Sequence, residues 1–234
     1  MTSDPAGASP GDPAAPPVPA WRRQTQGEQR WPASVAVVLV IVLQLTLPGE
    51  LTTAGHFVLP AVEVVLATVL VSANPLRITR RRPFLRAVSL ALIGVASLVN
   101  GWSLVLLVRA VLDGSIGSAQ ELLLTGGNIW ITNIVIFALW YWELDRGGPG
   151  SRATGEDPDP DFLFPQMADT TGAFHHWEPE FVDYAYVSFT NASAFSPTDT
   201  MPLSRWAKMA MMLQASVSLL TAVLIVARAV NLLP

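Results

Sequence analysis

The sequence predicts an all-α membrane protein with about five transmembrane helices and one short re-entrant segment before the last of them. Of the 234 residues, 51% are hydrophobic and only 14% are charged, whereas a soluble domain carries about a quarter charged residues. The apolar residues also gather into long stretches, as crossing the roughly 30 Å hydrocarbon core of a bilayer requires. A lipid bilayer is therefore the expected surroundings of most of the chain.

Composition and missing motifs exclude several function classes. A net charge of −4 leaves no basic surface for nucleic acid, so no nucleic-acid partner is expected. The absence of cysteine excludes disulfides, thiolate metal sites and cysteine nucleophiles. The common motifs of serine hydrolases, zinc proteases and nucleotide-binding enzymes are also absent, so we expect neither an enzyme nor a cofactor.

The first 143 residues divide into a polar tail and four apolar stretches. Residues 1–30 are rich in Pro, Ala, Gly and Asp, which predicts a disordered tail. The region 31–143 predicts four transmembrane helices, with Trp31 at its start and a Trp-Tyr-Trp cluster at its end as interfacial anchors. The apolar stretches cover about 32–48, 57–75, 84–112 and 119–143.

The arginines predict the orientation of these helices. The tail carries three, including Arg30, and the loop between the second and third stretches carries five more. The loops near 49–56 and 113–118 carry none, and cytoplasmic loops are the ones enriched in basic residues. We therefore expect a multipass protein of a bacterial inner membrane, with its N-terminus, its arginine loop and the segment after the fourth helix in the cytoplasm.

The next segment, 144–177, is polar and acidic, which predicts a solvated loop. Its acidic residues lack the spacing of a calcium-binding loop. Its two histidines, His175 and His176, are adjacent, and neighbours on a helix or strand point apart, so no metal site is predicted. A pH-sensing role of these imidazoles stays open, because they titrate near neutrality.

The segment 178–202 predicts a short helix followed by an irregular turn. Pro179 stands where a helix favours its first residue, and about 15 residues at helical spacing follow. This helix is too short and too polar to span a membrane, and the last apolar helix, 203–234, comes directly after the turn. Such a pattern is typical of a re-entrant element, whose irregular backbone must be surrounded by protein or by a water-filled cavity.

The stretch NASAFSPTDTMPLSRWAK resembles the filter and post-filter region of tetrameric pore-loop cation channels. The region from FALWYWELDRGGP to ARAVNLL also resembles an uncharacterised bacterial family of multipass membrane proteins. The channel resemblance, which covers part of the C-terminal third of the chain, implies a homo-oligomer, such as a tetramer, that conducts inorganic ions. The filter-like residues are Thr190, Asn191, Ser193, Ala194, Phe195, Ser196, Pro197, Thr198 and Asp199.

The filter-like stretch departs from a potassium filter. No glycine lies between Thr190 and Pro202, although glycines allow the alternating backbone that points carbonyls at the ion. Potassium selectivity is therefore not predicted. Hydroxyl side chains with a ring of Asp199 carboxylates would favour cations less selectively. The arginine count also places this loop in the cytoplasm, whereas potassium channels present it from the outside.

The last helix carries a polar stripe on one face, which predicts either a cavity wall or hydrogen bonds to another helix. Both alternatives stay open. The stripe consists of Gln214, Ser218, Thr221 and Arg228. Arg228 stands near the end of the helix, where a guanidinium reaches the membrane interface at little cost.

Three further polar residues lie within the other spans and support an alternative function. Glu63 is expected to face the bundle interior with Arg109 as its candidate partner, and Asn100 adds an amide. The leading prediction is an oligomeric pore of the ion-channel type that favours cations. The alternatives are a small-solute or proton-coupled transporter that uses Glu63, and a non-conducting membrane scaffold.

Overall fold

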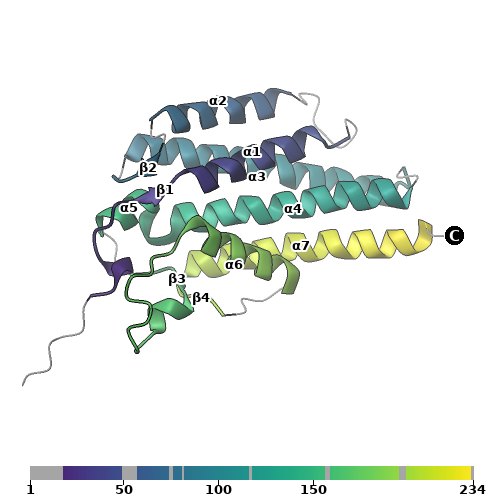
Figure 1. Ribbon diagram of the computed structural model, residues 1–234. Coiled ribbons are helices and arrows are strands. Elements are labelled where there is room, and N and C mark those ends of the chain that lie inside the picture. The colour runs from purple at the N-terminus through teal and green to yellow at the C-terminus, as the bar shows by residue number, and fades with distance from the viewer. Residues whose placement is uncertain are drawn as a thin grey trace, which may run out of the picture.

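The structure is a mostly helical bundle. The computed structural model describes residues 18–48, 57–73, 76–80, 82–115, 118–155, 159–194 and 199–232, with side chains to residue 228. Helix makes up 74% of it. Among the described residues, five helices of 15 residues or more run side by side (Figure 1). They are α1 (Trp31–Leu45), α2 (Val58–Ala73), α3 (Pro83–Leu112), α4 (Ala119–Leu144) and α7 (Arg205–Leu232).

Three helices in the described part of the chain are long and apolar enough to cross a membrane. They are α3, the stretch Ala119–Thr154 that contains α4, and the part Arg205–Arg228 of α7. α1 and α2 are also apolar but have only 15 and 16 residues. The predicted class of an all-α membrane protein is thus supported by three helices that can span a bilayer.

α4 lies at the centre of the bundle and packs against α1, α3, α6 and α7. Its side chains Leu122, Ile129 and Tyr141 are 0% exposed. α7 approaches α4 closely at Gly126, where a Cβ atom would lie only 2.5 Å from Cδ1 of Ile225. Small residues permit such close approach of membrane helices. The Trp-Tyr-Trp cluster at the end of α4 differs from the expected interfacial anchor, because Tyr141 and Trp142 are buried within the protein.

Two short antiparallel strand pairs tie loops together at one end of the bundle. β1 (Glu28–Gln29) pairs with β2 (Arg77–Ile78), and β3 (Phe162–Leu163) pairs with β4 (Met201–Pro202). The first pair joins the N-terminal segment to the loop before α3. The two arginine-bearing segments therefore lie at the same end of the bundle, and the side of the membrane that this end faces stays a prediction.

The expected disordered tail is ordered in its described part, from residue 18 onwards. A 3-10 helix, η1 (Ala20–Arg22), begins this part, and Trp21 within it is only 6% exposed. The backbone amide of Ala20 donates to the carbonyl of His175, and that of Thr25 donates to the carbonyl of Ala153. The polar composition suggests that this segment cannot offset the entropy lost on ordering. The hydrogen bonds to a distant loop and the burial of Trp21 provide that compensation.

The segment 144–177 also differs from the expected solvated loop. It contains the 3-10 helices η3 (Asp145–Gly147) and η4 (Pro165–Ala168) and the short helix α5 (Pro149–Thr154). Most of η3 and α5 is buried, because the chain folds back under the end of α4.

The helix α6 (Phe181–Ala194) occupies the predicted position of the short helix. It lies against α4 and α7, along the part of them nearest to β3 and β4. β4 and the start of α7 lie at that same end (Figure 1).

Candidate functional site

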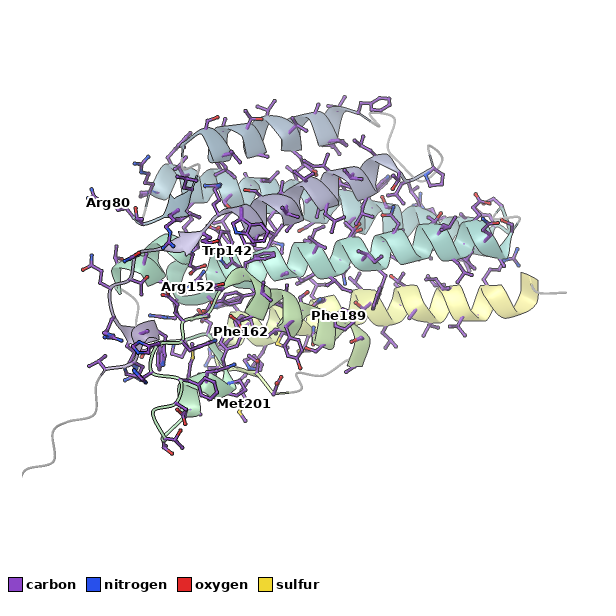
Figure 2. The ribbon with its side chains drawn as sticks, viewed as in Figure 1. Arg80, Trp142, Arg152, Phe162, Phe189 and Met201 are labelled. Atoms are coloured by element: carbon purple, nitrogen blue, oxygen red, sulfur yellow. The ribbon has the colours of Figure 1, made fainter. Side chains whose placement is uncertain are left out.

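The candidate site is the unit formed by α4, α6 and α7, because it holds the residues that resemble a channel filter. Two sets of polar side chains position α6 within this unit. One is a hydrogen-bond network along α7, and the other is a cluster of buried charges at the end of the bundle, where Arg80, Trp142 and Arg152 lie (Figure 2).

Gln214 of α7 joins the three helices. Its Oε1 accepts hydrogen bonds from the Tyr141 hydroxyl (2.6 Å) and the Asn191 amide (2.8 Å). Its Nε2 donates to the hydroxyl and the carbonyl oxygen of Ser188, at 2.7 and 2.9 Å. The amide is therefore satisfied on both sides although Gln214 is 0% exposed.

Further hydrogen bonds fix α6 and α7 against α4. The Ser188 hydroxyl donates to the Ile134 carbonyl at 2.6 Å. The Asn133 amide donates to the Ser218 hydroxyl at 2.9 Å and to the Gln214 carbonyl at 3.3 Å. Between helices that lie in lipid the hydrophobic effect does not drive association, and hydrogen bonds of this kind contribute to it together with van der Waals packing.

The polar stripe of α7 faces this network and not a cavity. Gln214, Ser218 and Thr221 are each 0% exposed, because α4 and α6 cover this side of α7. Side chains covered within one chain cannot line a space between subunits, so the structure favours the interhelical alternative for these three residues. Arg228, the fourth residue of the stripe, is half-buried near the end of α7.

The opposite faces of α6 and α7 are apolar and exposed. On α6 the residues Val182, Tyr186 and Phe189 are 66%, 49% and 52% exposed, and their spacing of four and three places them on one face. The exposed large side chains on α7 are Met209, Met212, Leu213, Leu219, Leu220, Val223 and Val226. These faces are available to lipid or to another copy of the chain.

A buried ion pair joins α5 to the N-terminal segment. Arg152 and Glu28 make a two-point contact, with Nε to Oε1 at 2.6 Å and Nη2 to Oε2 at 3.0 Å. Nη1 of Arg152 donates to the carbonyls of Trp142 and Asp145, both at 2.8 Å. The Trp142 indole donates to Glu28 Oε2 at 2.5 Å. The buried charges are thus matched and also hydrogen-bonded, as burial requires.

Asp145 connects the end of α4 to the first turn of α6. Its Oδ2 accepts a hydrogen bond from the Tyr184 hydroxyl at 2.6 Å. Its Oδ1 accepts from the backbone amides of Asp161 and Phe162, at 2.9 and 3.3 Å. Asp145 and Tyr184 are both 0% exposed, so this bond fixes where α6 begins relative to α4.

Asp161 holds together the chain before α6 and the chain after it. Its Oδ1 accepts from the Trp206 indole of α7 at 2.7 Å, and its Oδ2 accepts from the Arg146 amide at 3.0 Å. Its carbonyl accepts from the Leu203 amide at 2.7 Å, next to the β3–β4 pair. These bonds place the start of α7 beside the loop that leads to α6.

The turn after α4 requires residues that tolerate a positive φ. Arg146, Gly147 and Gly148 have φ values of 52°, 76° and 91°. A Cβ atom on Gly148 would lie 2.7 Å from the carbonyl oxygen of Glu143, so only glycine fits at this position. The turn reverses the chain and thereby brings Arg152 under the end of α4.

The filter-like residues are described only in part. Phe195, Ser196, Pro197 and Thr198 lie outside the described residues. The Thr190 hydroxyl donates to the carbonyls of Tyr186 and Val187, and the Ser193 hydroxyl donates to that of Phe189, so both bond within α6. Ser193, Ala194 and Asp199 are exposed, whereas Asn191 is buried in the Gln214 network.

Of the polar residues expected within α2 and α3, Asn100 lines a cavity together with residues of α4 and α7, whereas Glu63 faces α1. Glu63 is 0% exposed and faces Gln44 of α1, which is 3% exposed. Arg109, the partner expected from the sequence, is exposed near the end of α3, so the neighbour of Glu63 is an amide and not a guanidinium. Asn100 is buried, at 5% exposed.

The two histidines lie in the loop before α6. The rings of His175 and His176 have their centroids 3.8 Å apart, and Nδ1 of His175 contacts the Gly172 carbonyl at 2.5 Å. Among the described residues, no group of three His, Cys, Asp or Glu side chains is arranged to hold a metal ion.

The buried charge cluster does not follow from the sequence pattern. Composition predicts a disordered tail around Glu28 and a solvated loop around Asp145 and Arg152. One signal was available, since Glu143, Asp145 and Arg146 follow an aromatic end of an apolar helix without any spacer. Charges so close to a span need partners, which a search for complementary residues in both loops would have suggested.

Comparison with protein-family models, with curated proteins and with solved structures gives no match to this chain.

Proposed function

We propose that this protein is an integral membrane protein with five transmembrane helices, α1 to α4 and α7, that forms an ion-conducting pore as an oligomer. In this proposal α6 and the turn after it are a re-entrant segment, and copies of the chain meet at the exposed faces of α6 and α7. The observation that carries the proposal is the position of α6, which Gln214 holds between α4 and α7, while β4 and the start of α7 lie at the same end of the bundle as the start of α6.

The length of α6 supports a re-entrant segment. Fourteen residues of helix are about 21 Å long, which is less than the roughly 30 Å of hydrocarbon that a span must cross. The order of a spanning helix, a half-length helix, a turn and a second spanning helix is that of a pore-loop unit, whose turn lines the narrowest part of a pore. The filter-like resemblance of residues 190–199 covers the end of α6 and the segment that follows it.

Because the polar stripe of α7 is covered by α4 and α6, other residues of α7 line the proposed pore. The wall is formed by the exposed face of α7, which includes Met212, Leu213, Ser216 and Leu220. The polar constriction is formed by the turn after α6, with Asp199 as its charged residue. A ring of carboxylates attracts cations, so the pore favours cations over anions.

Electrical recording in planar bilayers tests this proposal. Purified wild-type protein should conduct cations, and Asp199→Asn should lower the conductance because the ring charge is lost. Asp169→Asn is the matched control, since it removes the same charge from the loop before α6, away from the proposed constriction in sequence, and should leave the conductance unchanged. Silent bilayers under ionic and pH gradients, or equal effects of the two variants, would contradict the proposal.

A second candidate function rests on Glu63. A carboxyl group that is 0% exposed and faces the Gln44 amide is expensive in a membrane helix, and intramembrane carboxyl groups are used in proton-coupled transport. In this alternative, proton-coupled uptake into proteoliposomes is abolished by Glu63→Gln and is unaffected by Asp199→Asn. The opposite pattern favours the pore, and a non-conducting scaffold responds to neither substitution.

A further inference from the structure

A pocket lined by arginines lies where the loop before α3 meets the end of α4. Its volume is about 50 Å³, and the turn 147–150 forms one wall. The arginines that line it are Arg30, Arg80, Arg82 and Arg86. Arg80 and Arg82 are exposed at the mouth, whereas Arg30 is only 9% exposed. Arg80 stands at the same end of the bundle as Trp142 (Figure 2).

An apolar groove continues from this pocket along the bundle. Its volume is about 80 Å³, and α1, α2, α3 and α4 all contribute to it. The pocket and the groove share Arg30, Leu70, Ser89 and Trp142. Away from the arginines the groove is lined by alkyl side chains such as Val37, Ala67 and Leu92, so a charged end and an apolar end adjoin in one continuous site.

The pocket has an excess of positive charge. One carboxylate, that of Glu143, faces its four arginines, and this carboxylate already accepts a hydrogen bond from the Ser89 hydroxyl at 2.9 Å. Nε of Arg86 is buried and has no acceptor within hydrogen-bond distance among the described residues. A guanidinium nitrogen without an acceptor is costly, and an anion beside the Arg86 side chain would balance part of this positive charge.

We propose that this site binds an anionic phospholipid, with its phosphate among the four arginines and the first few carbons of one acyl chain in the groove between α1, α2, α3 and α4. Guanidinium groups match the geometry of phosphate oxygens, and basic pockets at the ends of membrane helices select anionic headgroups. The apolar groove favours a lipid over a free phosphate, because a small soluble anion has no apolar part that could occupy the groove. This inference does not depend on the proposed pore, whose lining comes from the exposed face of α7 and the segment after α6.

Lipid titration of the full-length protein in detergent tests the proposal. Native mass spectrometry should show phosphatidylglycerol bound more tightly than phosphatidylcholine, and phosphatidylglycerol should raise the unfolding temperature more. In the double variant Arg80→Gln/Arg82→Gln, affinity for phosphatidylglycerol should fall about 30-fold, or about 2 kcal/mol, since each arginine near such a headgroup contributes about 1 kcal/mol. The matched control, Arg23→Gln/Arg205→Gln, removes two exposed arginines at the same end outside the pocket and should have little effect.

The groove is tested separately. Ala67→Phe fills it and should weaken phosphatidylglycerol binding, whereas Ala61→Phe, at an exposed position of the same helix outside the groove, should not. Equal affinity for phosphatidylglycerol and phosphatidylcholine, or an equal loss in the control arginine variant, would overturn the proposal in favour of non-specific lipid contact. Binding of glycerol 3-phosphate as tight as that of the lipid, and unaffected by Ala67→Phe, would overturn it in favour of a soluble phosphate ligand.

Discussion

The hydroxyl of Tyr184, in the first turn of α6, donates to Asp145 at the end of α4 over 2.6 Å. The Arg152 guanidinium lies 5.1 Å from the centroid of the Tyr184 ring, so this ring contacts the buried ion pair as well. The base of α6 is therefore fixed by a fully buried polar cluster, while its middle is fixed by Gln214. A rigidly held short helix is what a re-entrant segment needs.

Removing the Tyr184 hydroxyl tests this connection. Tyr184→Phe keeps the ring but leaves Oδ2 of Asp145 without its donor, which should cost about 1–3 kcal/mol of unfolding free energy. Tyr186→Phe is the matched control, because Tyr186 is exposed on the other face of α6, and its effect should stay within about 0.5 kcal/mol. Unfolding in a graded detergent mixture measures both, and equal values would show that the Tyr184–Asp145 bond contributes nothing.

The buried pair of Arg152 and Glu28 should behave as one unit. Arg152→Met leaves a buried carboxylate uncompensated, and Glu28→Gln leaves a buried guanidinium, so each should destabilise the protein by about 3–5 kcal/mol. The double variant should lose clearly less than the sum, because neither member of the pair is then left without the other. Additive losses in this double-mutant cycle would mean that the two side chains do not interact.

Replacing Gln214 should loosen the three-helix unit. Gln214→Leu removes four hydrogen bonds, and at about 0.6 kcal/mol for each bond between membrane helices the loss is about 2 kcal/mol. Ser216→Ala, at an exposed position of the same helix whose hydroxyl bonds only within α7, should have little effect. If Gln214→Leu unfolds like the wild type, the network does not hold α6 in place.

Local periodicity was enough to locate the helices but not to pair the polar residues. The apolar stretches predicted α1 to α4 and α7, and helical spacing predicted α6, each to within a few residues, because helix length, hydropathy and periodicity are local properties. The partners of Glu28 and Gln214 were not predictable in this way. Glu28 contacts Arg152, which lies more than a hundred residues away in the sequence. Gln214 is covered because α6 packs on its face of α7, and the sequence of α7 alone does not show where α6 packs.

The pH dependence of the loop before α6 follows from Asp169. Its carboxylate accepts hydrogen bonds from the Thr171 hydroxyl at 2.6 Å and from the amides of Thr171 and Phe174, which lowers its pKa from the ordinary 3.8 to about 2. The loop is therefore stabilised by this carboxylate above about pH 4 and loses that stabilisation as the pH falls through 2.

An NMR titration of the Asp169 carboxyl carbon checks this value. The midpoint should lie near 2 in the wild type and move up towards 3.8 in Thr171→Ala, which removes the hydroxyl donor. A neighbouring substitution that removes no donor, Thr170→Ala, should leave the midpoint unchanged. A wild-type midpoint near 3.8 would show that the carboxylate is not held by these bonds in solution.

The central claim, that the turn after α6 lines an ion pathway, is tested most directly by a single cysteine at position 199. The wild-type chain contains no cysteine, so Asp199→Cys gives one reactive thiol. In planar bilayers, a positively charged thiol reagent should reduce the cation current of this variant, a reductant should restore it, and Thr170→Cys should not respond. Bilayers that carry no current, or a current that the reagent leaves unchanged, would contradict the claim.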